Sequence, residues 1–267
     1  MLGRAEFVER CRSIFTADET QAFWLWFTAH SFADQEEYNQ KLDRLLSGEP
    51  IQYIFQSAPF HRYEFAVGPG CLIPRPETEE LVEFILQKPE VQSLQQWLDI
   101  GTGSGCIALT LAQERPWNIQ AVDISYEALK WAQINWITCS DDVKKRVELQ
   151  SSDFLSWNKW PDGLQAIVSN PPYIATEEKP QINDRVNKWE PHTALYSPID
   201  PLLFYRKMAE LSTNSSTELW LFLEINQELA TETNEIFTAI GCQTKKIADL
   251  SGNLRFIEAF WPGKRIY

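Results

Sequence analysis

The first residues whose types and spacing could do chemistry form a glycine-rich loop, Asp99-Ile100-Gly101-Thr102-Gly103-Ser104-Gly105. The loop follows an apolar stretch that predicts a strand and precedes a pattern that predicts a helix. Its glycines therefore stand where the backbone must turn sharply and let a ligand approach closely. The spacing is GxGxG, with Cys106 where GxGxxG would need its third glycine, which argues against a dinucleotide site. We expect the loop to bind a nucleoside without a pyrophosphate.

Two later strand ends carry side chains that suit a nucleoside. Asp123 ends the predicted strand IQAVD some twenty residues after the loop, where a carboxylate can accept hydrogen bonds from both ribose hydroxyls. Asp153 and Phe154 follow the next predicted strand and suit an adenine amino group and an adenine face. An ordinary turn Asp and a core Phe are an equal alternative for these last two residues.

The second group is the tetrapeptide Asn170-Pro171-Pro172-Tyr173, which directly follows the apolar segment LQAIVS. A planar nitrogen with two hydrogens could donate one to the Asn170 side-chain oxygen and one to the Pro171 carbonyl, while Tyr173 stacks on the flat group. The prolines fix the backbone and remove two N–H donors. Two acceptors raise the electron density on a poorly nucleophilic amide nitrogen and hold it in place, which predicts a catalytic clamp.

An alternation of strands and helices must position these residues. From residue 77 onward, short apolar runs alternate with amphipathic segments, which predicts an α/β fold with a parallel sheet and helices on both faces. The segments TKKIADL and RFIEAFW near the end are separated only by SGN, which predicts an antiparallel hairpin at the sheet edge. Ser125 is a predicted helix N-cap.

The first quarter of the chain has a different pattern. Apolar residues recur at helical spacing from about residue 4 to residue 48, which predicts a bundle of short helices that ends at Gly48 and Pro50. The stretch 51–76 is rich in aromatic and β-branched residues broken by Pro and Gly, so we expect a strand pair there. We therefore predict an N-terminal domain over 1–76 and a second domain over 77–267.

Composition narrows the classes of function. The net charge of −13 disfavours a nucleic-acid substrate, which normally draws on clustered Lys and Arg. Five scattered cysteines without a CxxC and three separated histidines predict neither a disulfide framework nor a metal site. No membrane span or signal segment is indicated, so we expect a cytoplasmic protein.

These residues resemble the class I methyltransferases that modify planar nitrogens, a group in which NPPY is shared by enzymes acting on adenine, on guanine and on glutamine. Further segments resemble one family, the peptide chain release factor N5-glutamine methyltransferases. They are SGEPIQYI at 47–54, LIPRPETE at 72–79, VSNPPYI at 168–174, EPHTAL at 190–195, LFYR at 203–206 and DLSGN at 249–253. The resemblance covers nearly the whole chain.

The resemblance implies a class I methyltransferase fold, Rossmann-like, with a mostly parallel seven-stranded sheet, an antiparallel C-terminal hairpin, and a small helical domain and β-hairpin linker before it. It implies methyl transfer from S-adenosylmethionine to the glutamine of the Gly-Gly-Gln loop of release factors, with the helical domain helping to grip that partner. Carried over by motif, the residues that contact the cofactor are Gly101, Thr102, Gly103, Ser104, Gly105, Asp123, Phe154 and Asn170. Those that hold the substrate are Asn170, Pro171, Pro172 and Tyr173, of which Asn170, Pro171 and Tyr173 are the expected catalytic residues.

Three positions depart from the family pattern. Gln56 stands where a glycine is usual, and Asn226 stands at the final glycine of the usual motif LEIG or LEHG. The segment TNSSTEL at 213–219 replaces a common Pro-Gly-Gly turn. Asn tolerates left-handed backbone, so we expect Asn226 to preserve the turn. Arg75 and Glu77 could form an exposed ion pair between domains or shape the roof of the cofactor pocket, and the sequence favours neither.

Two other functions use the same residues. A nucleic-acid amino methyltransferase would share the clamp but predicts a basic face or a target-recognition domain, and the sequence indicates neither. A methyltransferase fold without activity would serve as a binding module, and the intact Asp123 and NPPY argue against it.

Overall fold

A seven-stranded sheet is the centre of the molecule in a computed structural model that describes residues 3–197 and 199–264. Its strands are β3 (Gln96–Ile100), β4 (Asn118–Asp123), β5 (Val147–Ser151), β6 (Ala166–Ser169), β7 (Leu219–Glu224), β8 (Gln243–Ala248) and β9 (Leu254–Trp261). The strand order is β5-β4-β3-β6-β7-β9-β8. The first five are parallel, and β9 runs antiparallel to both β7 and β8. The predicted fold class, including the C-terminal hairpin, is confirmed.

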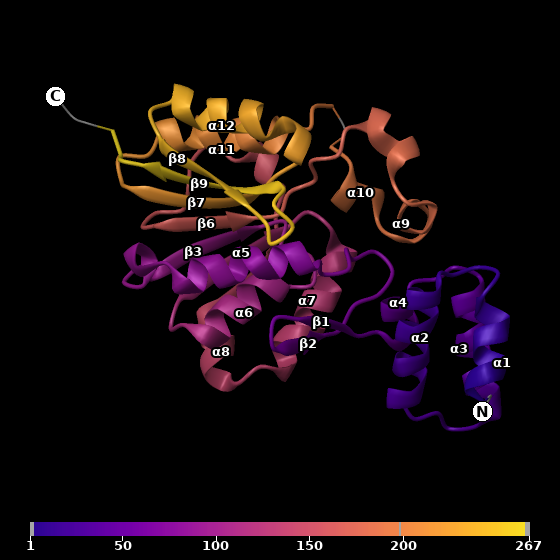
Figure 1. Ribbon diagram of the computed structural model, residues 1–267. Coiled ribbons are helices and arrows are strands. Elements are labelled where there is room, and N and C mark those ends of the chain that lie inside the picture. The colour runs from indigo at the N-terminus through magenta and orange to yellow at the C-terminus, as the bar shows by residue number, and fades with distance from the viewer. Residues whose placement is uncertain (1–2, 198, 265–267) are drawn as a thin grey trace.

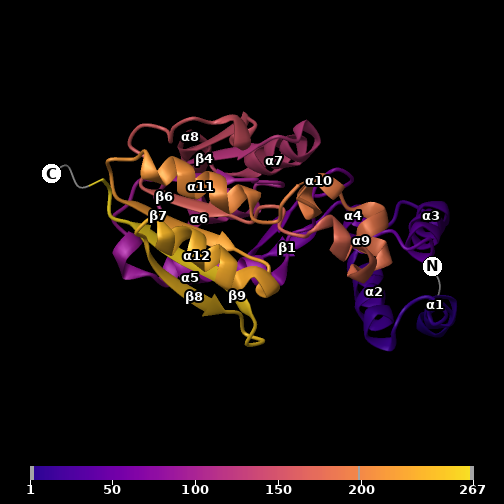
Figure 2. The same ribbon diagram turned by 90° about the horizontal axis from the view of Figure 1, so that it is seen from above.

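Helices cover both faces of this sheet (Figures 1 and 2). One face carries α5 (Pro76–Gln87), α6 (Cys106–Glu114), α7 (Tyr126–Thr138) and α8 (Asp141–Arg146), and the other carries α11 (Leu203–Thr213) and α12 (Ala230–Ala239). Each face has its own apolar core, with the stacked Trp97 and Trp117 rings on the first and Tyr205 and Met208 on the second. The central strands β3, β6 and β7 are buried on both sides, because helices cover both faces of the sheet there. Short 3-10 turns complete this part: η1 (Pro89–Val91), η2 (Phe154–Ser156) and η4 (Gln227–Leu229).

The strand register decides which residues meet. Ile100 at the end of β3 pairs with Val122 of β4 on one side and with Ser169 of β6 on the other. The residues at the carboxyl ends of these strands, and those directly after them, therefore come together at the end of the sheet where open α/β folds bind ligands. They include the glycine loop, Asp123 and Asn170.

The N-terminal bundle consists of α1 (Arg4–Cys11), α2 (Ala17–Ala29), α3 (Gln35–Leu46) and α4 (Ile51–Phe55) around a core of Phe7, Phe27, Tyr38 and Leu42. The start of α2 is fixed by a capping box between Thr16 and Glu19. The strand pair expected in 51–76 is confirmed as the antiparallel hairpin of β1 (Ala58–Phe60) and β2 (Tyr63–Phe65). The first five residues of this stretch form α4, which the apolar pattern does not predict.

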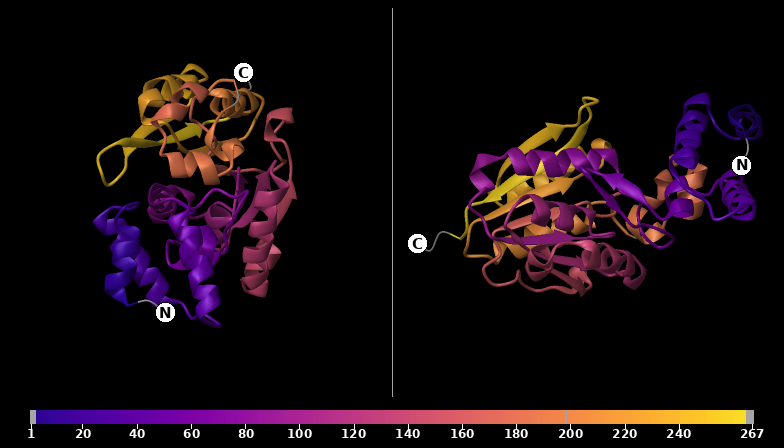
Figure 3. Two further views of the ribbon diagram at one scale, coloured as in Figure 1. Left: turned by 90° about the vertical axis from the view of Figure 1, so that its right-hand side faces the viewer. Right: turned by 90° about the horizontal axis from the view of Figure 1, so that it is seen from below.

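A segment inserted after β6 connects the bundle to the sheet (Figure 3). It contains η3 (Thr176–Gln181), α9 (Asp184–Trp189) and α10 (His192–Leu195), none of which the apolar pattern predicts. Arg185 of α9 forms an ion pair with Glu19 of α2 and lies over the Phe15 ring, and Lys188 donates to the Ser47 carbonyl. The bundle thereby stands beside the carboxyl ends of the strands, at the end of the sheet that carries the site.

The departures from the family pattern have separate explanations. Gln56 has a φ of 53°, in the left-handed region that favours glycine, and it ends α4. Asn226 has a φ of −69°, so the expectation of a left-handed backbone is wrong there. Its side chain instead accepts a hydrogen bond from the Glu228 N–H at 3.0 Å and caps η4. In 213–219, the Ser215 hydroxyl holds the turn by bonding to Thr217.

Candidate active site

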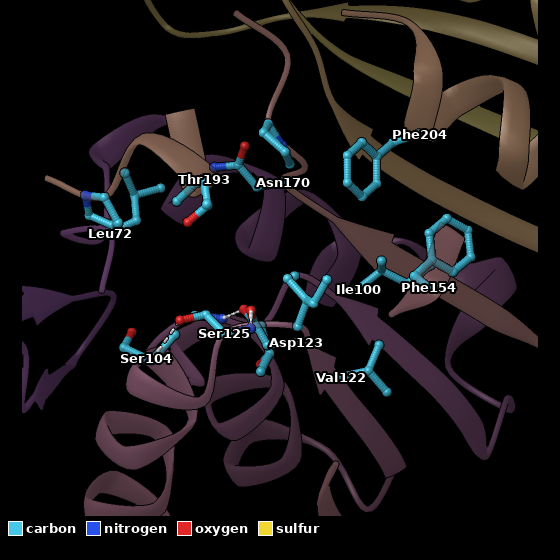
Figure 4. Close-up of a pocket in the computed structure, with 18 of the residues that line it drawn as sticks. Leu72, Ile100, Ser104, Val122, Asp123, Ser125, Phe154, Asn170, Thr193 and Phe204 are labelled. Atoms are coloured by element: carbon cyan, nitrogen blue, oxygen red, sulfur yellow. Dashed lines mark hydrogen bonds between the residues drawn. The ribbon is translucent and has the colours of Figure 1, made fainter. Parts of the chain in front are cut away.

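A cavity of about 460 Å³ opens at the carboxyl ends of β3, β4 and β6, within the usual range for small-molecule sites. Figure 4 shows Asn170 across this cavity from Asp123, with Phe154 and Phe204 toward one end and Leu72 and Thr193 toward the other. Its wall is mostly apolar and includes residues 100–104 of the glycine-rich loop.

The glycine loop is held by its own backbone. The Gly101 and Thr102 N–H groups donate to the Val122 carbonyl at 2.9 and 3.0 Å, which ties the loop to β4. Gly101, Gly103 and Gly105 all have positive φ, and a side chain at Gly105 would meet Leu109 at 3.1 Å. The loop therefore requires glycine at these positions, as the sequence predicts.

The side chains of this loop do different things. The buried Thr102 hydroxyl donates to Asp99 at 2.6 Å, and burial raises the pKa of Asp99 to about 7. Ser104 is buried in the cavity wall, and its carbonyl accepts from Asn135. Gly105 is the N-cap residue of α6 and does not itself line the cavity. Thr102 and Asp99 therefore hold the loop in shape, and the backbone of Gly101 to Ser104 forms the surface toward a ligand.

Asp123 lines the cavity with its carboxylate anchored on the loop. Its Oδ2 accepts from the Gly103 N–H at 2.9 Å and its Oδ1 from the Ser125 N–H at 2.8 Å. Burial raises the pKa of Asp123, and these backbone N–H groups oppose the shift. Each oxygen keeps a second lone pair, so the group can accept two further hydrogen bonds, as two ribose hydroxyls require.

Phe154 is both a core residue and a wall of the cavity. Its ring stacks on Trp160 at a centroid distance of 5.8 Å and lies 6.2 Å from Phe204, which also lines the cavity. Asp153 lines the same end, and its carboxylate accepts from the Leu155 N–H at 3.0 Å. This end offers flat apolar surfaces and one exposed carboxylate, which suits a purine base with an amino group.

The residues of the tetrapeptide 170–173 lie in two different environments. Asn170 and Pro172 line the cavity, whereas Pro171 is buried and Tyr173 packs against the apolar core beneath α11. Asn170 Nδ2 donates to Thr78 Oγ1 at 3.0 Å. Within residues 3–197 and 199–264, no donor bonds to Asn170 Oδ1 or to the Pro171 carbonyl. The Asn170 oxygen is thus left for a ligand on the cavity wall, whereas Pro171 is not among the lining residues and its part in the expected clamp stays a prediction.

A buried carboxyl group is hydrogen-bonded to this tetrapeptide, directly at Tyr173 and through Thr78 at Asn170. Glu224 ends β7 and is 2% exposed. Its Oε2 accepts from the Thr78 hydroxyl at 2.7 Å and its Oε1 from the Tyr173 hydroxyl at 3.1 Å. Tyr173 is thereby tied to the same carboxyl that reaches Asn170 through Thr78.

A second buried carboxylate holds the roof of the cavity. Glu190 accepts from the Ile73 N–H at 3.1 Å and from Arg75 Nη2 at 2.6 Å. It thereby joins the segment 72–75 to α10, and both contribute to the cavity wall. Arg75 pairs with Glu190 rather than Glu77 and itself lines the cavity, so it combines an ion pair with a place in the roof.

The sequence alone indicates no role for Thr78, Glu190, Phe204 and Glu224. Thr78, Glu190 and Phe204 lie in segments that resemble the family, but their residue types and spacing point to no particular contact. Glu224 carries the same signal as Asp123, a carboxyl at the end of an apolar strand, and that signal could have identified it. In the described part of the chain, no helix is long and apolar enough to cross a membrane, and no three or more His, Cys, Asp or Glu side chains gather as metal ligands.

Comparisons with known proteins agree with this geometry. The chain matches the family "Methyltransferase small domain" over residues 78–188. Among solved structures, the hMettl16 catalytic domain in complex with MAT2A 3'UTR hairpin 6 is similar in fold, with a TM-score of 0.56, 16% identity, and 88% of this chain and 84% of that chain covered. That likeness concerns the fold alone.

Curated relatives are much more similar in sequence. A protein of Flavobacterium psychrophilum named release factor glutamine methyltransferase is 37% identical over 283 residues, covering 96% of each chain. Proteins of the same name from Bacteroides thetaiotaomicron and Lactococcus lactis are 43% and 41% identical, covering 74% and 80% of this chain and 70% and 78% of their own. With the methyltransferase fold, the glycine loop and the NPPY segment in place, the chain belongs to the release factor glutamine methyltransferase family.

Proposed function

We propose that this protein transfers a methyl group from S-adenosylmethionine to the side-chain amide nitrogen (N5) of the glutamine in the Gly-Gly-Gln loop of peptide chain release factors. It would act in the cytoplasm, in support of translation termination. The observation that carries the proposal is Asn170, which lines a nucleoside-sized cavity. Its side-chain nitrogen is held by Thr78, and among the described residues no donor occupies its oxygen. Membership of the family supports the same substrate.

The cavity residues fit the cofactor. Asp123 has the two free lone pairs that a ribose needs, and the glycine backbone leaves room for close approach, with nothing within 4 Å of a side chain added at Gly103. Phe154 and Phe204 offer faces for an adenine. When bound, S-adenosylmethionine supplies an electrophilic methyl group on a sulfonium sulfur, which keeps the electron pair of the broken S–C bond as a neutral thioether.

The chain itself binds and orients the nucleophile. Asn170 Oδ1 and the Pro171 carbonyl would accept the two N–H groups of the glutamine amide, which raises the electron density on nitrogen and restricts its motion. The nitrogen lone pair forms the new N–C bond, and one N–H proton is lost to solvent. Pro172 lies against the cavity and limits the space beside the amide. The role of Tyr173 is to hold the loop through Glu224 rather than to stack on the substrate.

Mass spectrometry of a release factor incubated with the enzyme and labelled S-adenosylmethionine tests this proposal. We expect one methyl group on the loop glutamine. A release factor with that glutamine changed to asparagine is the matched control. The shorter side chain misplaces the nitrogen by about an ångström, which costs on the order of 10²-fold in rate. Equal labelling of both proteins, or stronger labelling of DNA or ribosomal RNA under the same conditions, would contradict the proposal in favour of a nucleic-acid substrate.

A further inference from the structure

Glu224 is a buried carboxyl group that the proposed reaction does not use directly. Its side chain lies at the end of β7, between α5 and the tetrapeptide 170–173, and accepts hydrogen bonds from Thr78 and Tyr173. A buried carboxyl destabilises a fold unless hydrogen bonds compensate its lost hydration, and an apolar residue would continue the strand without that cost. The position therefore requires a chemical reason beyond packing.

The direction of the hydrogen bonds around Glu224 supplies this reason. Thr78 has one hydroxyl proton, which it donates to Glu224 Oε2 at 2.7 Å. Toward Asn170 the same hydroxyl can then only accept, so the side chain of Asn170 must present Nδ2, which lies 3.0 Å away. The opposite end of the amide, Oδ1, is thereby left as the acceptor of this cavity-lining residue, and no described donor bonds to it.

Reversing the hydrogen bond between Thr78 and Glu224 would also reverse the one between Thr78 and Asn170. If Glu224 carried a proton toward Thr78, the hydroxyl would be free to donate to Asn170 Oδ1, and the amide would turn its NH2 group to the cavity. Two donors would then face each other at the substrate nitrogen, which is a repulsive arrangement. We infer that Glu224 is a positioning residue that acts through Thr78 to fix the acceptor end of Asn170 toward the substrate amide. This inference rests on the proposed function, which assigns the substrate nitrogen to Asn170.

The groups around Glu224 keep its ionisation within reach of ordinary pH. Burial raises the pKa of Glu224 to about 7, while hydrogen bonds from Thr78 and Tyr173 and the charge of Arg255 on β9 oppose that rise, and Glu77 on α5 adds to it. Burial also raises the pKa of Tyr173, so its hydroxyl keeps its proton and donates. From α11, the Tyr205 hydroxyl donates to the backbone carbonyl of Glu224 at 2.7 Å. Above pH 7 the ionised Glu224 can only accept, which fixes the clamp.

The pH dependence of kcat for methyl transfer to a release factor tests the inference. In the wild type we expect kcat to rise through a pKa near 7, with the dissociation constant for S-adenosylmethionine nearly constant. Glu224→Gln should abolish this acidic limb whatever its absolute rate, because the amide does not titrate. Glu258→Gln is the matched control, since Glu258 is a mostly buried carboxylate of β9 paired with Lys88, which lies at the opposite end of α5 from Thr78. That variant should keep the limb.

Two variants of Thr78 test the relay without altering Glu224. Thr78→Val has nearly the same shape but no hydroxyl, and we expect it to lower kcat by roughly 10–100-fold while the cofactor affinity changes little. The lost bond to the buried Glu224 should also lower the melting temperature by roughly 3–12 °C. Thr78→Ser keeps the hydroxyl and should stay within a few-fold of wild type. Equal losses in both variants, or an unchanged acidic limb in Glu224→Gln, would overturn the inference while methyl transfer to glutamine still occurred. Absence of transfer by the wild type at every pH would overturn the proposed function instead, and this inference with it.

Discussion

Replacing Glu190 by glutamine tests what the ion pair between Arg75 and Glu190 does. It could only link two segments of the chain, or it could also hold the roof of the cavity in the shape that the cofactor needs. Glutamine has one acceptor oxygen. If that oxygen keeps the bond to the Ile73 N–H, the new NH2 group faces the Arg75 guanidinium, donor against donor. The change therefore removes one charge-assisted hydrogen bond from a side chain that is only 2% exposed.

The magnitude follows from that burial. A hydrogen bond to a charged group contributes about 1.5–3 kcal/mol when buried, whereas an exposed pair contributes about 0–1 kcal/mol. At about 2–4 °C per kcal/mol, Glu190→Gln should lower the melting temperature by roughly 3–12 °C. Because the segment 72–75 and α10 both line the cavity, the loosened roof should also raise the cofactor dissociation constant by about tenfold, or about 1.4 kcal/mol.

Differential scanning calorimetry and isothermal titration measure the two effects separately. The control is Asp43→Asn, which breaks an exposed ion pair with Arg10 in the N-terminal bundle and should change the melting temperature by no more than about 4 °C. A lower melting temperature with unchanged cofactor affinity would refute the roof interpretation. If neither quantity changed, the reasoning from buried hydrogen bonds would itself be wrong.

Three further changes test other parts of the site. Asp123→Ala should weaken binding of S-adenosylmethionine without unfolding the protein, and an unchanged dissociation constant by calorimetric titration would exclude Asp123 from ribose binding. Asn170→Ala should lower kcat by roughly 10²–10³-fold with a smaller effect on release-factor affinity, and turnover within a few-fold of wild type, at the same nitrogen, would contradict the clamp. The raised pKa values of Asp99 and Glu224, each about 7, favour their neutral forms in the fold. Their stabilising contribution is full below the pKa of the unfolded chain and is lost as pH rises through 7, by on the order of 3 kcal/mol each. Urea unfolding should therefore show lower stability at pH 8 than at pH 5.5, and Glu224→Gln should flatten that slope; a slope unchanged by the substitution would show that Glu224 does not titrate there.

The fold is largely predictable from the sequence because its signals are local. Strand-helix alternation, the short SGN connection and the glycine loop each depend on neighbours in sequence, and the structure bears them out. The helix Ile51–Phe55 escapes prediction because aromatic and β-branched residues fit a buried helix as well as a strand. The helices of the insert after β6 escape it because they are short and mostly exposed, and so have no clear apolar period.

The site is predictable where one residue type at a strand end suffices, as for Asp123 and Asn170. It is not predictable where function depends on a contact between distant segments. Nothing in the local pattern around Thr78 indicates that its hydroxyl meets Glu224, and the same holds for Glu190 and Ile73. The expected backbone angle of Asn226 is wrong for a related reason, because its side chain has a capping role that the residue type alone does not specify.

The separation of these contacts along the chain has a consequence for the order in which the protein can form. The bond from Gly103 to Asp123 spans 20 residues, whereas the bond from Thr78 to Glu224 spans 146. Bringing distant segments together is slow, and during synthesis the N-terminal part of a chain folds first. The contact between Gly103 and Asp123 can therefore form while the chain is still being synthesised, but the link from Asn170 through Thr78 to Glu224 is complete only after β7 has emerged. A chain that ended before Glu224 would also lack the end of β7 and the whole of β8 and β9, so the hydrogen bonds that Glu224 accepts from Thr78 and Tyr173 can form only late in synthesis.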